Sequence, residues 1–332
     1  MNIIQLGESI NMKVLVTGVA GFIGSHAAEL FVKNGYEVIG VDNFNNYYPV
    51  VLKEKNAADL EKIGVKIVKK DLRTDNLDDV TADVDFIVHL AAQPGISSKV
   101  TYKEYKENNL DATENLVSSS LKNLNLKLFI NAATSSVYGY YADSTEDIAP
   151  KPASYYGVTK LAAEQLVMFR QRFVNFPATS FRLFSVTGPR DRPNDKLFTK
   201  LIKNSLEEGL EPITIFKGSR DHKRSYTYVG DIVNAFLMAS KKPDVCVGQI
   251  FNIGTSEIIT TGQAMEFVEE ALGKKLNVVD VEETRAGDQQ VTSAVIDKVQ
   301  KVLGWSPQVS TKQALQEAVE WYKNEIHNKI NY

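Results

Sequence analysis

Hydrophobic and polar positions alternate between two patterns along the chain. Between 12 and 184, short and nearly continuous apolar runs rich in β-branched residues are separated by longer amphipathic stretches with helical spacing. The apolar runs are 14–16, 38–41, 65–68, 86–88, 128–130 and 179–183. Such runs are typical of parallel strands that are buried on both faces and joined by right-handed helical crossovers. The pattern predicts an α/β fold with a doubly wound parallel sheet.

The second half of the chain has a less regular pattern. Helical stretches are expected near 197–208, 231–240, 261–272 and 313–329, mixed with short strands at 249–253 and 276–281. We interpret 185–332 mainly as a smaller α/β substrate lobe, with segments near 225–255 returning to the first half. Because no repeat or Gly/Ser linker separates the halves, we expect them to share a cleft. Residues 1–11 precede the periodic pattern and are interpreted as an N-terminal extension.

Charge and composition restrict the partners. The 38 basic and 41 acidic residues leave a net charge of -3, so neither a nucleic acid nor an anionic membrane is expected as a partner. The single cysteine, Cys246, excludes an internal disulfide, and the four histidines lack metal-ligand spacing, so no metal is expected. No apolar run reaches the roughly 18 residues that span a bilayer. With no positive charge before Lys13 to mark a signal peptide, we expect a cytoplasmic protein.

A glycine-rich turn follows the first predicted strand. Gly18, Gly21 and Gly24 lie between this strand and a helical pattern, where glycines let the backbone approach a pyrophosphate at the helix N-terminus. Asp42 ends the second strand, 18 residues after Gly24, where an acid accepts hydrogen bonds from an adenosine ribose. These features predict a Rossmann sheet that binds NAD in preference to NADP. Asp71, after the third strand, is expected to reach the adenine edge.

A tyrosine and a lysine are spaced four residues apart at the start of a predicted helix. This spacing places Tyr156 and Lys160 on one helix face. A phenol is a poor base at neutral pH, but a neighbouring ammonium and the positive nicotinamide ring would stabilise its phenolate and lower its pKa. Together with the upstream glycine turn, the pair predicts proton transfer next to a nicotinamide cofactor.

Nine motifs in a fixed order resemble one known family. They read VTGVAGFIGSH, GVDNFNNYY, HLAAQ, SSVYG, YYGVTK, GPRDRP, YTYVGDIV, FNIG and RAGD, and the resemblance that they carry covers 12–322. In these motifs the chain resembles the extended short-chain dehydrogenase/reductases, in particular nucleotide-sugar 4-epimerases of the UDP-glucose and UDP-glucuronate type. The resemblance implies Tyr156, Lys160 and Thr134 as catalytic residues.

The resemblance also implies which side chains contact the ligands. For NAD these are Gly18, Gly21, Phe22, Ile23, Gly24, Asp42, Asn43, Asp71, Leu72, Leu90, Ala91, Ala92, Asn109, Tyr156 and Lys160. For the UDP-sugar they are Thr134, Ser135, Ser136, Ser185, Arg192, Arg224, Arg285 and Asp288. Of these, Arg224 and Arg285 match arginines that clamp the diphosphate, where a guanidinium can bond two phosphate oxygens. Asn109 is expected to serve structure near the nicotinamide.

The implied reaction oxidises the sugar at C4 to a 4-keto sugar and reduces it again on the other face. Ser135 and Ser136 stand where related dehydratases carry acidic residues, so elimination is disfavoured. A decarboxylase or other lyase acting on UDP-glucuronate and a net oxidoreductase or NAD-sensing protein remain alternatives.

Two positions bear on the substrate. Ser185 replaces an Asn of many UDP-galactose epimerases and resembles the hydroxyl residue of glucuronate epimerases, and Arg192 matches an arginine that can meet a sugar carboxylate. Because GPRDRP is also common among plain epimerases, UDP-glucose and UDP-galactose are placed first by a small margin, ahead of UDP-glucuronate and UDP-GlcNAc. The resemblance further implies a homodimer formed through helices near 103–121 and 155–172.

Overall fold

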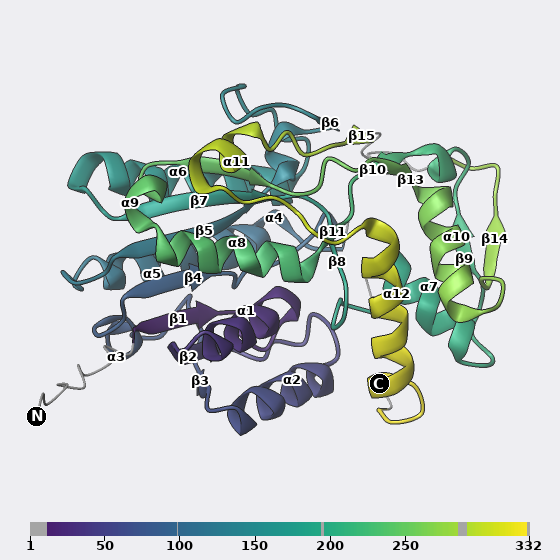
Figure 1. Cartoon of the computed structure of the whole chain (residues 1–332), viewed down its shortest axis with the longest axis horizontal. Helices are drawn as coiled ribbons and strands as arrows, with labels where there is room; N and C mark the ends of the chain where they lie inside the picture. Colours follow the sequence, from purple (N-terminus) through teal and green to yellow (C-terminus); the bar gives the residue numbers. More distant parts are fainter. Residues whose placement is uncertain (1–11, 98, 194–195, 285–290, 331–332) are drawn as a thin grey trace, which may run out of the picture.

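The chain folds around a seven-stranded parallel sheet in the computed structural model, which describes residues 12–97, 99–193, 196–284 and 291–330 (Figure 1). The strand order is β12-β7-β5-β4-β1-β2-β3, and every neighbouring pair runs parallel. The strands are β1 (Lys13–Thr17), β2 (Glu37–Asp42), β3 (Lys66–Lys69), β4 (Phe86–His89), β5 (Leu128–Thr134), β7 (Ala178–Leu183) and β12 (Ile250–Ile253). The predicted α/β fold with a doubly wound sheet is confirmed.

Helices cover both faces of this sheet, and this explains the continuous apolar runs. All seven residues of β5 are buried, as expected for a central strand with a hydrophobic layer on each side. One layer contains α1 (Phe22–Lys33), α2 (Val50–Lys62), α8 (Val229–Lys241) and α11 (Asp297–Leu303). The other contains α3 (Asp78–Thr81), α4 (Tyr102–Lys106), α5 (Ala112–Ser120) and α6 (Tyr155–Val174), with a π-helical turn at Glu107–Asp111 between α4 and α5.

The second lobe has its own apolar core and lies at the carboxyl ends of the strands, on the right in Figure 1. Its elements are α7 (Leu197–Leu206), β9 (Ile213–Ile215), α10 (Thr261–Leu272), β14 (Val278–Asp280), α12 (Thr311–Trp321) and the π-helical turn Tyr322–Ile326. The boundaries of α10 follow from local chemistry. A capping box joins Thr260 and Gln263 at its start, and Gly273 ends it with a φ of 74°.

Short strands connect the two lobes. They are β6 (Tyr141–Ala142), β8 (Val186–Thr187), β10 (Lys223–Arg224), β11 (Thr227–Tyr228), β13 (Ile259–Thr260) and β15 (Val291–Thr292). They form a four-stranded sheet in the order β13-β10-β15-β6 and a separate β11-β8 pair. The chain then returns to the first half, where α8 packs against α1 and β12 pairs with β7. The remaining short helix is α9 (Pro243–Cys246).

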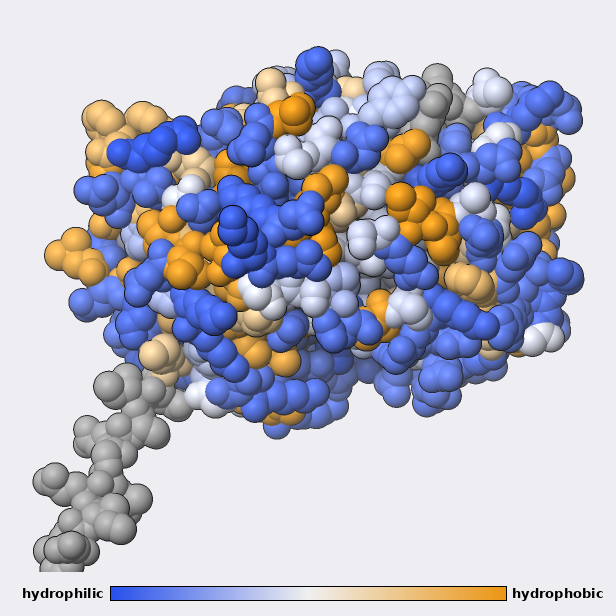
Figure 2. All heavy atoms as spheres, turned by 45° about the horizontal axis from the view of Figure 1, so that its top comes forward, coloured by the Kyte–Doolittle hydropathy of each residue, from blue (hydrophilic) through white to orange (hydrophobic). Residues whose placement is uncertain are grey.

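The outer surface is mainly hydrophilic on the face that Figure 2 shows, with separate apolar patches among the polar side chains. Every helix in the described ranges is too short or too polar to span a bilayer.

Candidate active site

One cavity of about 830 Å³ lies at the carboxyl ends of the central strands, between the sheet and the second lobe. A doubly wound sheet binds ligands where its strand order reverses, which here is between β1 and β4. The cavity is lined by all the NAD and substrate residues predicted from the sequence within the described ranges, except Asn109. Arg285 and Asp288 lie outside the described residues.

The glycine turn leaves the backbone open towards the cavity. Gly18 has a φ of 68°, and a Cβ atom there would lie 2.9 Å from the Ala91 nitrogen. A Cβ atom on Gly24 would overlap the Gly18 carbonyl oxygen, so only glycine allows α1 to start this close to β1. Gly21 precedes α1, whose first turn has neither a side-chain cap nor an acidic residue. Its free amides and helix dipole therefore suit the pyrophosphate of NAD.

Asp42 is fixed at the end of β2. Its carboxylate accepts hydrogen bonds from the backbone nitrogens of Ala20, at 3.2 Å, and Phe44, at 2.8 Å. It is buried and lines the cavity, so an oxygen acceptor stands where the ribose hydroxyls of NAD were expected.

Asp71 is held by two neighbours at the rim of the cavity. The Arg73 guanidinium contacts both of its carboxylate oxygens, at 2.6 and 2.9 Å, and lowers the pKa of Asp71 to about 2. The Asn43 amide donates a further hydrogen bond of 3.3 Å. The group is therefore an ionised acceptor, and its contact with the adenine edge remains a prediction.

His89 links the ends of β1 and β4 through buried hydroxyls. The Thr17 hydroxyl oxygen accepts from the backbone nitrogens of Leu90 and Ala91, at 3.1 and 3.2 Å, so its proton points to His89 Nδ1, 2.8 Å away. His89 Nε2 then donates to the Thr113 hydroxyl at 2.9 Å. Burial lowers the pKa of His89 to about 3 and keeps the ring neutral. The bonds fix the strand ends on which the cofactor would rest.

Asn109 has a structural position in the π-helical turn before α5. Its side-chain oxygen accepts from the Gln93 nitrogen at 2.7 Å, and its amide donates to the Thr159 hydroxyl at 3.1 Å. It is buried and joins the segment after β4 to α6, next to Lys160. This geometry agrees with the structural role expected for it and provides no direct contact with the cavity.

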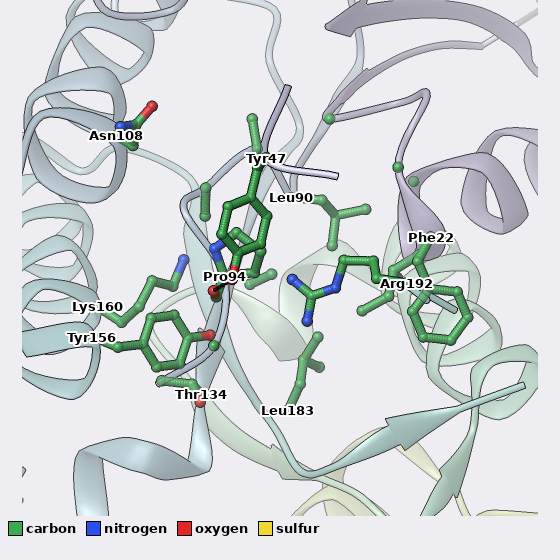
Figure 3. A pocket seen from close by; sticks show the side chains of 18 of the residues that line it. Phe22, Tyr47, Leu90, Pro94, Asn108, Thr134, Tyr156, Lys160, Leu183 and Arg192 are labelled. Atoms are coloured by element: carbon green, nitrogen blue, oxygen red, sulfur yellow. Dashed lines mark hydrogen bonds between the residues drawn. The ribbon is translucent and has the colours of Figure 1, made fainter. Parts of the chain in front are cut away.

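Tyr156 and Lys160 enter the cavity from the first turns of α6 (Figure 3). The Ser154 side chain caps this helix by accepting from the Gly157 nitrogen at 3.1 Å. The cap fixes where the helix begins and so places Tyr156 in its first turn. Lys160 is only 3% exposed, and burial lowers its pKa to about 8, against the opposing charge of Glu164. The predicted placement of both side chains on one face is found.

Several groups act on the pKa of the Tyr156 phenol. Burial raises the pKa of Tyr156, while a hydrogen bond with Thr134, the charge of Arg192 and a backbone hydrogen bond from Gly95 oppose this rise. Arg192 is thus a second cation in the cavity wall, and the stabilisation of the phenolate by Lys160 remains a prediction.

The predicted sugar residues of the described ranges line the same cavity as this phenol. Thr134 ends β5, and its hydroxyl oxygen accepts from the Ser136 nitrogen at 3.2 Å. Ser135 and Ser136 start the 3₁₀ turn that follows, and Ser185 comes directly after β7. These side chains line the cavity together with Arg192 and Arg224. Arg192 is 8% exposed and its guanidinium points into the cavity (Figure 3).

Two residues of the cavity wall were not singled out from the sequence. The Tyr47 ring lies across the cavity, and its hydroxyl donates to the Pro94 oxygen at 3.3 Å (Figure 3). Lys53 is buried and donates two hydrogen bonds of 2.8 Å to Asn45, one to the backbone oxygen and one to the side chain. The aromatic and polar run after Asp42 in GVDNFNNYY was the available signal.

Comparisons with known proteins identify the family. Residues 14–254 match the model of the NAD dependent epimerase/dehydratase family. An uncharacterised UDP-glucose epimerase of Bacillus subtilis, YtcB, is 36% identical over 92% of this chain and 96% of its own length. The UDP-glucuronate 4-epimerase of Thermodesulfobacterium geofontis is 35% identical over 94% of this chain and 96% of its own.

A solved structure is similar over nearly the whole chain. The UDP-glucuronic acid 4-epimerase of Bacillus cereus, in complex with UDP-glucuronic acid and NAD, has a TM-score of 0.87 and 35% identity, covering 94% of this chain and 99% of that one. The chain therefore belongs to the NAD dependent epimerase/dehydratase family. It is an NAD-dependent enzyme, and the glycine turn and Asp42 are suited to hold that cofactor.

Proposed function

We propose that this enzyme is a 4-epimerase of UDP-glucuronate, which inverts C4 by transient oxidation to a 4-keto sugar. The observation that carries the proposal is the joint placement of Arg192 and Tyr156 at one end of the cavity. The similar proteins named as UDP-glucuronate 4-epimerases support it. The sequence motifs placed glucose and galactose first by a small margin, and the pocket changes that order in favour of glucuronate.

The chain provides the acid–base groups that the reaction needs. NAD supplies a hydride acceptor and donor when bound. Tyr156 takes the proton of the C4 hydroxyl and later returns it, and Thr134, through its hydrogen bond with the phenol, orients that proton. Lys160 adds a buried positive charge to the same wall and favours the ionised phenol. No acidic residue stands at 135 or 136 to protonate a leaving hydroxyl, so elimination is disfavoured.

The position of Arg192 selects a charged sugar. The reacting C4 hydroxyl must lie within hydrogen-bond reach of Tyr156, and C6 is only two bonds from C4. Arg192, whose guanidinium points into the cavity that Tyr156 lines, can therefore reach the group at C6. A carboxylate there can form two parallel hydrogen bonds with a guanidinium, whereas the hydroxymethyl group of glucose offers one neutral acceptor. Ser185, on the same side of the cavity, can donate a further hydrogen bond.

A second arginine of the described cavity wall, on the side of the second lobe, suits the diphosphate. Arg224, on β10, lines the cavity from the second lobe, and Lys196 precedes α7 on the same side. Both side chains carry positive charge opposite the sheet that holds the cofactor. We assign the UDP diphosphate to this wall, in agreement with the role that the family resemblance implied for Arg224.

The test is to incubate the purified enzyme separately with UDP-glucuronate, UDP-glucose and UDP-GlcNAc, and to separate the products. UDP-glucuronate is expected to give UDP-galacturonate with a kcat/KM at least about tenfold above the other two, as a charged hydrogen-bond pair implies. Arg192→Ala should remove this preference, and Arg192→Lys should restore only part of it. A preference for UDP-glucose, release of carbon dioxide, or steady formation of NADH would refute the proposal.

We also infer that two copies pair through the outer face of α6. Along this helix, exposed apolar side chains recur at 155, 158, 169 and 173, and the Phe169 and Phe173 rings stack at 5.3 Å. Tyr102 of α4 extends the stripe, with its ring 5.4 Å from that of Tyr155. A continuous apolar stripe on two neighbouring helices fits a second copy related by twofold symmetry.

Light scattering after gel filtration tests this inference. Phe173→Asp should raise the dimer dissociation constant on the order of 100-fold, because twofold symmetry places the lost apolar contact in the interface twice. Leu124→Asp is the control, because Leu124 is 93% exposed and lies in the loop after α5. A wild-type protein that is monomeric at micromolar concentration would contradict the inference.

A further inference from the structure

The loop that carries Arg192 has an unusual backbone. Gly188 has a φ of 143° and Arg190 a φ of 66°, a left-handed conformation that non-glycine residues seldom adopt. Within the loop, the Asp191 nitrogen donates to the Gly188 oxygen at 3.4 Å, and the Arg192 nitrogen donates to the Asp191 carboxylate at 2.8 Å. A strained backbone of this kind persists where surrounding contacts determine it.

Two side chains of α1 provide those contacts. His26 Nε2 lies 2.9 Å from the Pro189 carbonyl oxygen, and because a carbonyl can only accept, the ring donates this hydrogen bond. Burial and the charge of Arg190 lower the pKa of His26 to about 4, so the ring is neutral at physiological pH. Glu29 lies one turn further along α1, and its carboxylate contacts Arg190 Nη2 at 2.6 Å. Both members of this ion pair are largely buried, with side-chain exposures of 23% and 16%.

Helix α1 therefore contacts two parts of the active site, the glycine turn and the loop that carries Arg192. Its first turn, at Phe22, lines the main cavity beside the glycine turn, and its second and third turns hold the loop that ends in Arg192. Arg190 faces a separate small cavity with Pro193 and Asn56, so it has no direct route to the substrate. Its contact with Glu29 fixes the backbone two residues before Arg192.

We propose that the Glu29–Arg190 ion pair, with the His26 hydrogen bond, is a latch that positions Arg192 for a sugar carboxylate and so determines substrate specificity. Arg190 and Glu29 are positioning residues, and the inference rests on the proposed function. The latch fixes Arg192 relative to the cofactor helix. A substitution that breaks the latch weakens the recognition of a charged group at C6. It leaves unchanged the glycine turn and the residues assigned to the UDP diphosphate, Arg224 and Lys196.

The test compares the binding of UDP-glucuronate and UDP-glucose by calorimetry on the NAD-loaded enzyme. Arg190→Gly removes the ion pair but tolerates the left-handed backbone, so it separates the latch from backbone strain. This variant is expected to weaken UDP-glucuronate binding about tenfold and UDP-glucose binding less than about twofold, with the NAD content unchanged. The reversed pair, Glu29→Arg with Arg190→Glu, should restore most of the loss. Lys122→Ala, which breaks the surface ion pair with Asp78 (2.7 Å), is the control and should change neither affinity.

Three results would overturn the latch. The first is that Arg190→Gly binds UDP-glucuronate as tightly as the wild type does. The second is that Arg190→Gly loses the same affinity for both nucleotide sugars, which would indicate general damage to the site. The third is a reversed pair that binds no better than Arg190→Gly. An Arg192→Ala variant, measured in parallel, separates the two proposals. If Arg192→Ala keeps the preference for UDP-glucuronate, the proposed function is refuted and the latch proposal with it. If Arg192→Ala loses the preference but Arg190→Gly keeps it, the latch proposal alone is refuted.

Discussion

The buried ion pair between Glu164 and Arg182 allows a prediction of stability from geometry. Glu164 of α6 is fully buried, and Arg182 of β7 is 2% exposed. The Arg182 Nε and Nη2 atoms donate to the two Glu164 carboxylate oxygens at 2.9 and 2.7 Å. Arg182 Nη1 donates to the Tyr138 hydroxyl at 2.8 Å, and this hydroxyl in turn donates to the Asn252 side-chain oxygen, also at 2.8 Å. The pair thus joins α6, β7, β12 and the turn after Thr134.

Glu164→Gln is nearly isosteric but removes the counterion of a buried guanidinium. It also turns one acceptor into an NH₂ group that faces the N–H donors of Arg182. Removing one partner of a buried ion pair costs about 3–5 kcal/mol of the free energy of unfolding, because the other charge stays buried and uncompensated. Replacing both charges, with Glu164→Leu and Arg182→Met, should recover most of this loss, since neither charge of the pair is then left buried without its partner. The Tyr138 hydroxyl keeps its hydrogen bond to Asn252 in the double variant.

Urea titration measures these differences. Trp305 is fully buried, so its fluorescence reports loss of the native packing, and far-UV circular dichroism reports the helices. Coincidence of the two curves establishes that unfolding is two-state before free energies are compared. A Glu164→Gln variant within about 1 kcal/mol of wild type would refute the reasoning. A double variant as unstable as the single one would show that packing, and not the unpaired charge, decides the loss.

Three further predictions concern the catalytic and cofactor residues. Tyr156→Phe should lower turnover by about 10²–10⁴-fold while NAD stays bound, because only the acid–base group is lost; wild-type turnover would contradict its role. Gly24→Ala should yield protein without NAD, since its Cβ atom would overlap the Gly18 carbonyl, and the absorbance of released nucleotide checks this. Burial lowers the pKa of Lys160 from its ordinary value of 10.5 to about 8, so this burial costs about 3 kcal/mol below pH 8, and the cost disappears as the pH rises towards 10.5. Lys160→Met should therefore raise the melting temperature at pH 7 but not near pH 10.5; an equal gain at both would exclude this cause.

The sequence predicted the sheet well because its signals are local. Continuous apolar runs predict strands that are buried on both faces, and the glycine spacing after the first run predicts the turn into α1. Lys160 follows Tyr156 by one helical turn, so their common face also follows from spacing alone. The helices expected at 103–121 and 155–172 are found too, although a π-helical turn interrupts the first at Glu107–Asp111.

Other features depend on residues that are distant in the chain. Tyr47 reaches Pro94 across the cavity, and the side chains of α1 hold the loop at 188–193, over 150 positions away. Arg192 is another example, because it follows Tyr156 by 36 positions and lines the same cavity. Such contacts leave no periodic pattern, since each side chain is an ordinary polar residue within its own segment.

By itself, the sequence determined the class of sheet, the cofactor turn and the family, because periodicity and motif spacing are properties of neighbouring residues. Only the tertiary structure decided where the charges meet. It brought Arg192 into the cavity that Tyr156 lines, paired Glu29 with Arg190 and buried Glu164 against Arg182. The physical reason is that electrostatic energy depends on distance and burial in space, and the path of the chain between two charges does not enter it.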